Sequence, residues 1–464
     1  MDDSTSVPSP ADPRDARIAE LEAKLDAALK RIAELEAIIE KLTRGGKRQA
    51  APFSKGLPKL NPKKPGRKPG DGYGTPPAFR SMPEPTPADQ VIEVPAPEVC
   101  PSCGDASAAV VESIDEQVQR DIEVRTVVRR FKIKVCRCAR CGKVRRGKHP
   151  LQTSTATGCC ASQVGPLARS AMAFMNKTLG LSLGKIADLF GTLWKLEVTR
   201  GGVSHAIGSI GNKCRDDYRA ILNAVANSEQ VTCDETGWRV GGWGAWLHAA
   251  ATEKARAYLI DPARGKEATD KLIGEHYGGT MVHDGWAPYD RYTSAIHQQC
   301  DAHLLRRCNE MMEVARGRAR HFPQQIKAIL QRGLRLRNER QTGARTLRST
   351  RIHAGKLTRL IRQLCKPRKS NPANDRLAGF CYRHAEELFT FLTQEGIDAT
   401  NFRGEQALRA AVVNRKVWGG NRTWRGAEMQ SVLMSVLNTL RLQGEDAIAW
   451  LHRKLLHQHP PVFV

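Results

Sequence analysis

The stretch VTCDETGWRV, residues 231–240, places two acidic residues, Asp234 and Glu235, inside a run of strand-forming residues. Carboxylates in such a run are costly to bury unless they are paired with a cation or bind a metal ion. Neighbouring side chains on a strand face opposite sides of the sheet, so only one of the two can face a given site. The stretch predicts a strand that carries one ligand-like carboxylate.

The sequence around this stretch predicts an α/β domain. QVTCDETGWRV, AWLHAAATEKARAYLI and GTMVHDGWAPY are typical of strands and turns, and GKEATDKLIG is typical of a helix. Asp284 follows TMVH much as Asp234 follows VTC. If the two strands are neighbours, their carboxylates converge at one end of a sheet and repel each other unless cations lie between them. Mg²⁺ prefers that kind of site.

A third carboxylate has to come from the helical part of the chain. ATNFRGEQALRAAVVNRK, residues 399–416, offers Glu405, with Arg409 one turn later and Arg415 and Lys416 beyond. These three cations are candidate DNA-binding residues. Glu405 and Arg409 share a helix face. An acid followed by a base four residues on is common on any solvated helix, so this stretch alone leaves both interpretations open.

The composition favours a polyanionic partner. The 464 residues include 73 Lys+Arg and 48 Asp+Glu, a formal net charge of +25. That excess favours nucleic acid, with a ribosome-like protein, a membrane-surface protein or a basic proteome as alternatives. No apolar run is long enough to span a membrane, and the start, MDDSTSVPSPADPRDAR, is unlike a secretory signal. We therefore expect a cytosolic protein whose 13 Cys are metal ligands and buried thiols rather than disulfides.

A heptad repeat runs through residues 15–43. Two apolar rows, offset by three residues, share the spacing of seven: Ile18, Leu25, Ile32 and Ile39, and Leu21, Ala28, Leu35 and Leu42. Such rows bury a seam only against another helix, so residues 1–46 predict a dimerising coiled coil. An antiparallel hairpin or an intramolecular helix is the alternative.

Residues 47–90 form a basic, Pro/Gly-rich linker with too few apolar residues for a core. KKPGRKPG, residues 63–70, resembles a short arm that could lie in a DNA minor groove, and a solvated tether is an equally good interpretation. Both attract phosphate. The candidate DNA-binding residues here are Lys63, Lys64, Arg67 and Lys68.

Residues 91–150 predict a zinc ribbon. CPSCG and CARCG supply two CxxC knuckles, whose thiolates can close a tetrahedral zinc site: Cys100, Cys103, Cys138 and Cys141. A strand-like segment separates the knuckles. Cys136 lies close enough to Cys138 to exchange with it as a ligand, and unmetallated thiols are the alternative.

Residues 151–228 are predicted to be helical. LSLGKIADLF and EVTRGGVSHAIGSIGNKC fit two short helices joined by a turn. That pattern is consistent with a helix-turn-helix whose second helix reads DNA, and equally with a plain helical bundle.

Five stretches, in this order, carry a family resemblance: DETGWRV, HDGWAPYDRY, QCDAHLLRR, TNFRGEQALR and RGAEMQSVLMSVLNTLRLQG. Together with the order of the parts, they make the chain similar to transposases of the insertion-sequence-66 family over nearly its whole length. The resemblance implies an α/β, RNase H-like catalytic core over residues 229–418. It also implies a large helical insertion at about 305–398 and a C-terminal helical segment over 419–464.

The same resemblance implies an acidic DDE triad in which Asp234 is the first acid, Asp284 the second and Glu405 the third. Glu428, in RGAEMQ, is the rival for the third acid. Because strand neighbours face opposite ways, Glu235 should point away from the metals and into a structural pair. A swap of the roles of Asp234 and Glu235 is the alternative.

The implied reaction is two-metal DNA strand cleavage and transfer. One Mg²⁺ (or Mn²⁺) lowers the pKa of a water or a DNA 3′-hydroxyl, a second ion stabilises the leaving oxygen, and attack on phosphorus is in line. The expected partners are double-stranded DNA (the element's terminal inverted repeats and target DNA), further copies of the chain, and small accessory proteins of the same element. We expect a bacterial, nucleoid-associated protein. A catalytically silent DNA-binding derivative and an RNase H-fold nuclease are the competing functions.

The segment between Asp284 and Glu405 is long, helical and basic. Cys300 and His303 have CxxH spacing, which favours a structural role near the active site because a zinc site needs four ligands. NERQTGARTLRSTRIHAGKLTRLIRQLCKPRK, residues 338–369, fits phosphate contact, with a solvated helix face as the alternative.

Overall fold

The computed structural model describes residues 125–158 and 163–457, together with 89–95 and isolated positions between 21 and 35 and between 104 and 122. The chain divides into two compact units, Met1–Arg125 and Thr126–Val464. In the first unit, the described residues between 21 and 35 are helical. The rest of the expected coiled coil, the candidate arm (Lys63, Lys64, Arg67 and Lys68) and the first zinc knuckle (Cys100 and Cys103) lie outside the described residues.

A five-stranded mixed sheet is the centre of the second unit. Its strands lie in the order β5-β4-β3-β6-β7. The strand bounds are Gln230–Val240 (β3), Trp243–Ala251 (β4), Arg256–Asp261 (β5), Thr280–His283 (β6) and Ile296–Gln299 (β7). The first three are antiparallel neighbours, whereas β6 runs parallel to β3 and β7 parallel to β6. This mixed α/β arrangement is compatible with an RNase H-like core.

The hairpin between β3 and β4 turns on two glycines. Gly241 and Gly242 have φ angles of 60° and 86°, in the left-handed region that a two-residue hairpin turn requires and that glycine adopts at no steric cost. The turn fixes the register, which places Asp234 opposite Ala249 and Glu235 opposite His248.

The two faces of β3 pack against different cores. Val231 and Cys233 belong to a core shared with helices that precede and follow the sheet. Trp238 and Val240 point to the opposite face, where they pack on α12, Phe402–Trp418. Because side chains alternate along a strand, Asp234 is on the α12 face and Glu235 is not.

The first of these cores joins segments from three parts of the sequence. Helices α2 to α5 precede the sheet, and α13 and α14 close the chain. Their bounds are Pro166–Lys177 (α2), Leu183–Trp194 (α3), Arg200–Lys213 (α4), Arg215–Ala226 (α5), Trp424–Leu442 (α13) and Ala447–Leu455 (α14). The sheet and these flanking helices therefore share one hydrophobic core. A further helix, α6, Lys266–Ile273, connects β5 to β6.

Helices α3 and α4 are separated by a short turn. Ser182 and Thr199 cap their first turns, each side chain accepting a hydrogen bond from the backbone three residues on. Lys195 ends α3 in the left-handed conformation, with φ of 50°. The two helices match the segments predicted from LSLGKIADLF and EVTRGGVSHAIGSIGNKC, and α4 packs on α2 and α13. A DNA-reading role for α4 stays a prediction.

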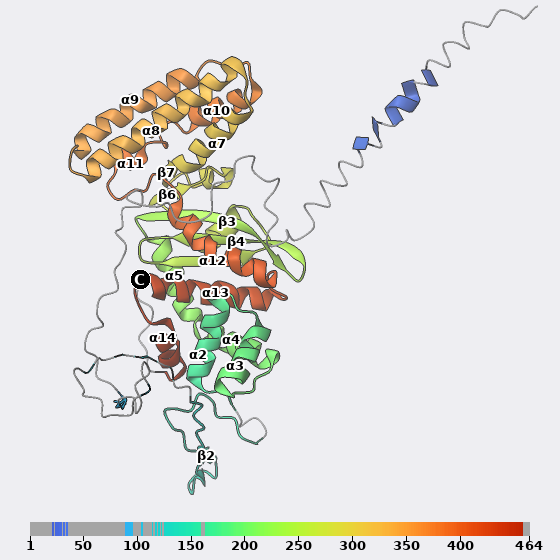
Figure 1. Cartoon of the computed structure of the whole chain (residues 1–464), viewed down its shortest axis with the longest axis vertical. Coiled ribbons are helices and arrows are strands. Elements are labelled where there is room, and N and C mark those ends of the chain that lie inside the picture. Colours follow the sequence, from blue (N-terminus) through green and yellow to red (C-terminus); the bar gives the residue numbers. More distant parts are fainter. Residues whose placement is uncertain are drawn as a thin grey trace, which may run out of the picture. The chain divides into compact units, whose positions relative to one another are not determined.

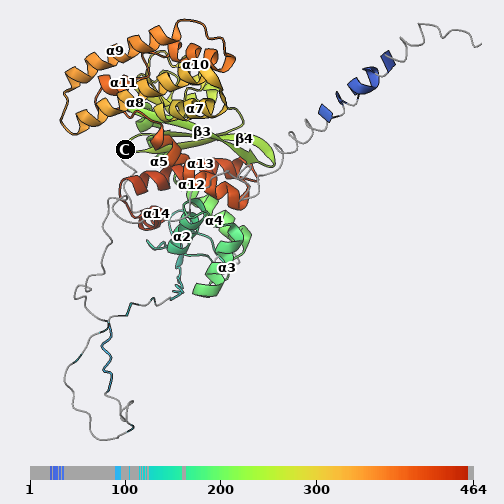
Figure 2. The ribbon, with the colours of Figure 1, turned by 45° about the horizontal axis from the view of Figure 1, so that its top comes forward.

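A second helical layer with its own core lies between β7 and α12 in the sequence. Its helices are Asp301–Val314 (α7), His321–Gln341 (α8), Leu347–Cys365 (α9), Pro372–Arg383 (α10) and Thr390–Thr393 (α11). These helices coincide with the predicted insertion. Figures 1 and 2 show the sheet between this insertion and the pair α12 and α13.

Helix α13 covers the free edge of the outer strand β5. Three hydroxyl groups one helical turn apart accept hydrogen bonds from alternate N–H groups of the strand: Arg256 to Thr439, Tyr258 to Ser435 and Ile260 to Ser431, at 3.0, 2.9 and 3.0 Å. The match is geometric, because four helical residues rise about 6 Å and two strand residues about 6.7 Å.

In the described part of the chain, no helix is long and apolar enough to cross a membrane.

Candidate active site

Two aspartates lie side by side at one end of β3 and β6. The parallel register pairs Thr232 with Val282, so two residues further along each strand the chain reaches Asp234 and Asp284. Asp234 Oδ1 accepts a hydrogen bond from the backbone N–H of Glu235 at 2.9 Å. Asp284 Oδ1 accepts one from the backbone N–H of Trp286 at 3.0 Å. Each carboxylate keeps its other oxygen for a further partner.

Glu405 reaches the same region from the first turn of α12. The helix crosses β3 so closely that a Cβ on Gly404 would lie 3.1 Å from the Cβ of Asp234. The glycine is needed for this approach. Glu405 Oε1 lies 3.7 Å from His303 Nε2 and 3.9 Å from an Arg306 guanidinium nitrogen, both on α7. These two cationic or polar groups hold the third acid at the rim of the site.

The four acids around this point repel one another. The pKa of Asp234 is raised to about 7, first by burial and then by the negative charges of Glu235, Asp284 and Glu405. A carboxylate in this situation gains stability when a cation arrives. The arrangement of the acids therefore favours binding of a cation next to Asp234.

The aspartate pair has the donor chemistry that Mg²⁺ takes. Mg²⁺ is usually bound by one or two carboxylates and completes its octahedron with waters and substrate phosphates. Among the described residues, no three His, Cys, Asp or Glu side chains are grouped closely enough to hold one ion. Asp234 and Asp284 would fit one ion as a pair of carboxylates, whereas the Glu405 carboxylate is turned toward α7.

Glu235 forms an ion pair on the other face of β3, in which its own side chain is buried and the arginine is partly exposed. Its Oε1 accepts from Arg264 at 2.8 and 3.1 Å, and its Oε2 accepts from the Tyr289 hydroxyl at 2.8 Å. The Arg264 guanidinium lies 4.5 Å from the ring centre of Trp246 and 4.6 Å from that of Trp286. This is a structural pair of the kind expected for Glu235. The sequence did not identify its partners, although Trp286 and Tyr289 belong to the HDGWAPYDRY stretch.

Asn401 is a residue of this site that the residue pattern did not single out for chemistry. Its side chain is fully buried, and neither its amide oxygen nor its nitrogen has a hydrogen-bond partner among the described residues. The amide oxygen would lie 2.5 Å from a Cβ on Gly404, the residue that contacts Asp234. An unpaired buried amide beside a carboxylate is available to orient a water or a ligand.

Cys300 and His303 contact the site, and among the described residues they belong to no group of three metal-ligating side chains. Cys300 Sγ accepts a hydrogen bond from the backbone N–H of Asn401 at 3.1 Å, which ties the start of α7 to the start of α12. His303 faces Glu405, and its Nδ1 is buried without a partner in the described structure. Asp301, which directly follows Cys300, is fully buried, and burial raises the pKa of its carboxyl well above its usual range.

The rival third acid, Glu428, lies elsewhere. Its carboxylate pairs with Arg215 on α5, and Asp234 interacts electrostatically with Glu405 rather than with Glu428.

Of the candidate DNA-binding residues on α12, Arg409 and Lys416 are exposed. Arg415 donates to the backbone oxygen of Gly237, so it joins α12 to β3.

The second zinc knuckle is a tight hairpin. Strands β1, Val135–Arg137, and β2, Val144–Arg146, flank Cys138 and Cys141. The N–H of Cys138 donates to Lys143 O, and the N–H of Gly142 donates to Cys138 O, both at 2.9 Å. Backbone hydrogen bonds from Cys141 and Arg140 lower the pKa of the Cys138 thiol, which favours the thiolate that zinc binds. Cys136 lies on β1 and is exposed.

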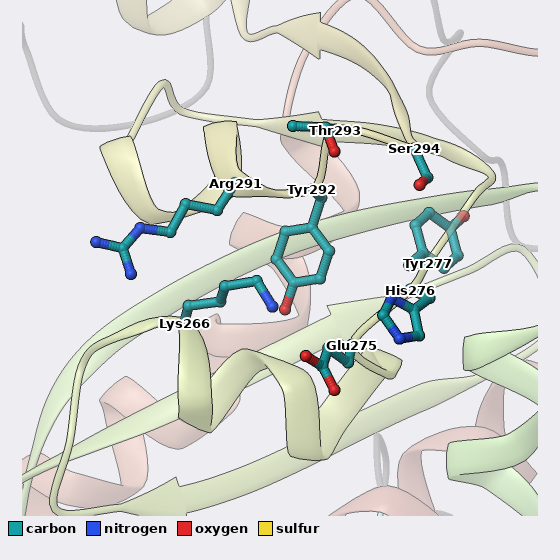
Figure 3. Close-up of a pocket in the computed structure, with 8 residues that line it drawn as sticks. All are labelled: Lys266, Glu275, His276, Tyr277, Arg291, Tyr292, Thr293 and Ser294. Atoms are coloured by element: carbon teal, nitrogen blue, oxygen red, sulfur yellow. The ribbon is translucent and has the colours of Figure 1, made fainter.

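A small hollow of about 190 Å³ lies apart from the triad, with none of the three acids in its lining. Figure 3 shows Lys266 and Tyr292 on one side of it and Glu275, His276 and Tyr277 on the other. Lys266 already pairs with Asp270 at 2.8 Å. The hollow carries both signs of charge, and we assign no chemistry to it.

A comparison with protein families matches the chain to one model. The model described as "Transposase IS66 family" matches residues 161–429. The matched range begins just before α2 and contains Asp234, Asp284 and Glu405. A comparison with curated proteins gives no match.

Proposed function

The chain belongs to the IS66 family of transposases, and from this premise we propose that it is a DDE-type DNA transposase. In this proposal it binds the ends of its element, cuts DNA strands there and joins them to target DNA by in-line phosphoryl transfer. The observation that carries the proposal is that Asp234 and Asp284 lie side by side at the ends of two neighbouring strands, with the first turn of α12, which carries Glu405, packed against Asp234.

In this proposal, different residues of the chain bind the metal ions and position the third carboxylate. Asp234 and Asp284 hold divalent ions, Mg²⁺ or Mn²⁺, and Glu405 supplies the third carboxylate. When bound, two such ions activate the attacking hydroxyl and stabilise the leaving oxygen. His303 and Arg306 position Glu405 from α7. The Arg306 side chain is 58% exposed, so its charge can also face a DNA phosphate.

The outer face of α9 supports DNA binding. The helix contains no acidic residue, and its cations form one stripe at helical spacing: Arg348, Arg351, Lys356, Arg359 and Arg362. Gly355 lies within this stripe, and nothing lies within 4 Å of where its Cβ would be. A glycine inside a helix lowers its stability, and here no contact in the described structure requires one. A phosphate backbone that approaches the helix closely would require it.

The cysteine knuckle supports a structural zinc ion. In the proposal, Cys138 and Cys141 bind Zn²⁺ together with Cys100 and Cys103. Metal analysis of the full chain should give about one zinc per chain, and Cys141→Ser should release it. Retention of the metal by Cys141→Ser would contradict this ligand set.

Cleavage by carboxylate variants tests the main proposal. Asp234→Asn and Asp284→Asn should each reduce Mg²⁺-dependent cleavage of a DNA carrying the element ends on the order of a thousandfold, because an amide keeps the shape and loses the charge that holds the metal. Binding of the ends should survive in both variants. Cleavage by either variant at the wild-type rate would contradict the assignment.

The alternative is a catalytically silent DNA-binding protein derived from such a transposase. The orientation of Glu405 toward α7, with no group of three metal ligands in the described structure, favours it. Wild-type protein that binds element ends but leaves them uncut with Mg²⁺, with Mn²⁺ and with the element's accessory proteins would establish this alternative. Metal-dependent cleavage by the wild type excludes it.

A further inference from the structure

An open hollow of about 570 Å³ lies between α7 and α10. Six residues line it: Arg307, Arg376, Gly379, Phe380, Tyr382 and Arg383. None of the six is acidic, and within the described residues none of the three guanidinium groups forms an ion pair with a carboxylate. Asp290 is near enough to Arg383 to interact with it electrostatically. The three cations outnumber this one acid and repel one another, so the hollow favours an anionic occupant.

The hollow adjoins the carboxylate site. Phe380 lies against Gly285, the residue directly after Asp284, and its Cζ would be 2.7 Å from a Cβ there. Gly285 has a φ of 87°, so both the close approach and the backbone require glycine. Arg307 is the neighbour on α7 of Arg306, which lies 3.9 Å from Glu405. A strand held at the carboxylates would have the hollow next to it.

The lining suits a nucleotide whose base is unpaired. Arginine binds phosphate through a planar fork of donors, and both guanidinium and tyrosine faces stack on bases. Tyr382 is 45% exposed, which leaves its ring available. Gly379 has nothing within 4 Å of its Cβ position, so the space beside it is open. In a duplex the bases already stack on one another, and only an unpaired base can use an aromatic face.

We propose that this hollow binds an unpaired nucleotide of the DNA strand that passes the carboxylates. The arginines contact its phosphates, and Tyr382 stacks on its base. The proposal rests on the proposed function, because it takes a DNA strand at Asp234 and Asp284 as given. It adds a specificity: the chain should prefer ends that carry a single-stranded tail.

Binding without cleavage tests this inference. The full chain is titrated, without added Mg²⁺, into two fluorescent DNAs that share one end sequence, one blunt and one with a short single-stranded tail. The wild type should bind the tailed DNA about tenfold more tightly, the contribution typical of stacking and phosphate contacts to one nucleotide. Gly379→Glu places a negative charge in the hollow and should abolish the preference while leaving blunt-end binding unchanged.

Gly379→Ala is the matched control. It adds a side chain at the same position without charge and should fold and keep the preference, because the added methyl meets no atom. Tyr382→Ala should lose part of the preference without any change at Gly379. Equal binding of both DNAs by the wild type, or a full preference in Gly379→Glu, would overturn the inference and leave the proposed function intact. A tail preference that depends on the hollow, in a chain that cuts no DNA, would support the inference and overturn the proposed function.

Discussion

The sheet and the helical insertion differ in where most of their charged groups lie. Around the sheet, charged groups lie inside: Asp234 is largely buried, and the Glu235 side chain is 2% exposed in its pair with Arg264. In the insertion the interior is mainly apolar, with Leu330, Ile361 and Leu377 fully buried, and the cations are outside on α9. In the described part of the chain, the acids therefore gather at the sheet while the cations of α9 lie on another surface.

The largest expected effect separates the two candidate third acids. Glu405→Gln should lower strand cleavage on the order of a thousandfold, because it removes a charge beside Asp234. Glu428→Gln, whose carboxylate pairs with Arg215, should keep the wild-type rate to within about twofold. The measurement is single-turnover cleavage of an end-bearing DNA. A dead Glu428→Gln with an active Glu405→Gln would reverse the assignment and leave the aspartate pair in place.

The next effect compares an arginine that pairs with a buried glutamate and an arginine on an open helix surface. Arg264→Leu leaves Glu235 buried without its cation and should lower the free energy of unfolding by about 3 kcal/mol. Arg348→Leu, on the outer face of α9, should change it by no more than about 0.5 kcal/mol. Urea unfolding of both variants gives the answer. Equal stabilities would mean that the Glu235 pair contributes no more than a surface charge.

A third prediction uses a buried lysine in the core that the sheet shares with the flanking helices. Lys177 donates to Gln430, and burial lowers its pKa from 10.5 to about 7. Between these two values the unfolded chain binds more protons than the folded one, so stability rises with pH there and loses this gain as the pH falls to about 7. The contribution is at most about 1.4 kcal/mol per pH unit.

Lys177→Met should reduce the increase of the free energy of unfolding with pH. Urea unfolding at several pH values between 7 and 10 measures this increase. Lys185→Met removes an exposed lysine on α3 and should leave the slope unchanged. An identical pH dependence in wild type and Lys177→Met would show that Lys177 is not the source of the slope.

The smallest effect comes from one substitution made in both regions. Gly355→Ala on α9 should raise the free energy of unfolding by about 0.5–1 kcal/mol, because it improves the helix and meets no atom. It should also weaken DNA binding if the phosphate backbone approaches there. Gly211→Ala on α4 should instead destabilise, since its Cβ would lie 2.5 Å from Met429 Sδ. Thermal unfolding measures both, and the same sign at the two positions would contradict the packing described.

The sequence predicted the elements that carry the acids better than it predicted what surrounds them. The run around Asp234, the short strand before Asp284 and the helix of Glu405 have clear local patterns, and all three elements are present. The alternation of side chains along β3 predicted that Glu235 would form a structural pair. It could not identify Arg264 as the partner, because only the folded sheet brings the two residues together. The common core of α2, β3 and α13 was also not predicted, because an apolar helix face does not specify the surface on which it packs.

The covered edge of β5 limits how two copies of this chain can associate. With the N–H groups of Arg256, Tyr258 and Ile260 already bonded to the hydroxyls of α13, a strand from another molecule finds no donors to pair with. At the opposite edge, beyond β7, Thr390 donates to His297 O and the N–H of Gln299 donates to Glu387 O. The sheet is therefore protected at both sides against edge-to-edge aggregation. A continuous intermolecular sheet built on these five strands is therefore excluded, and any contact between copies has to use other surfaces.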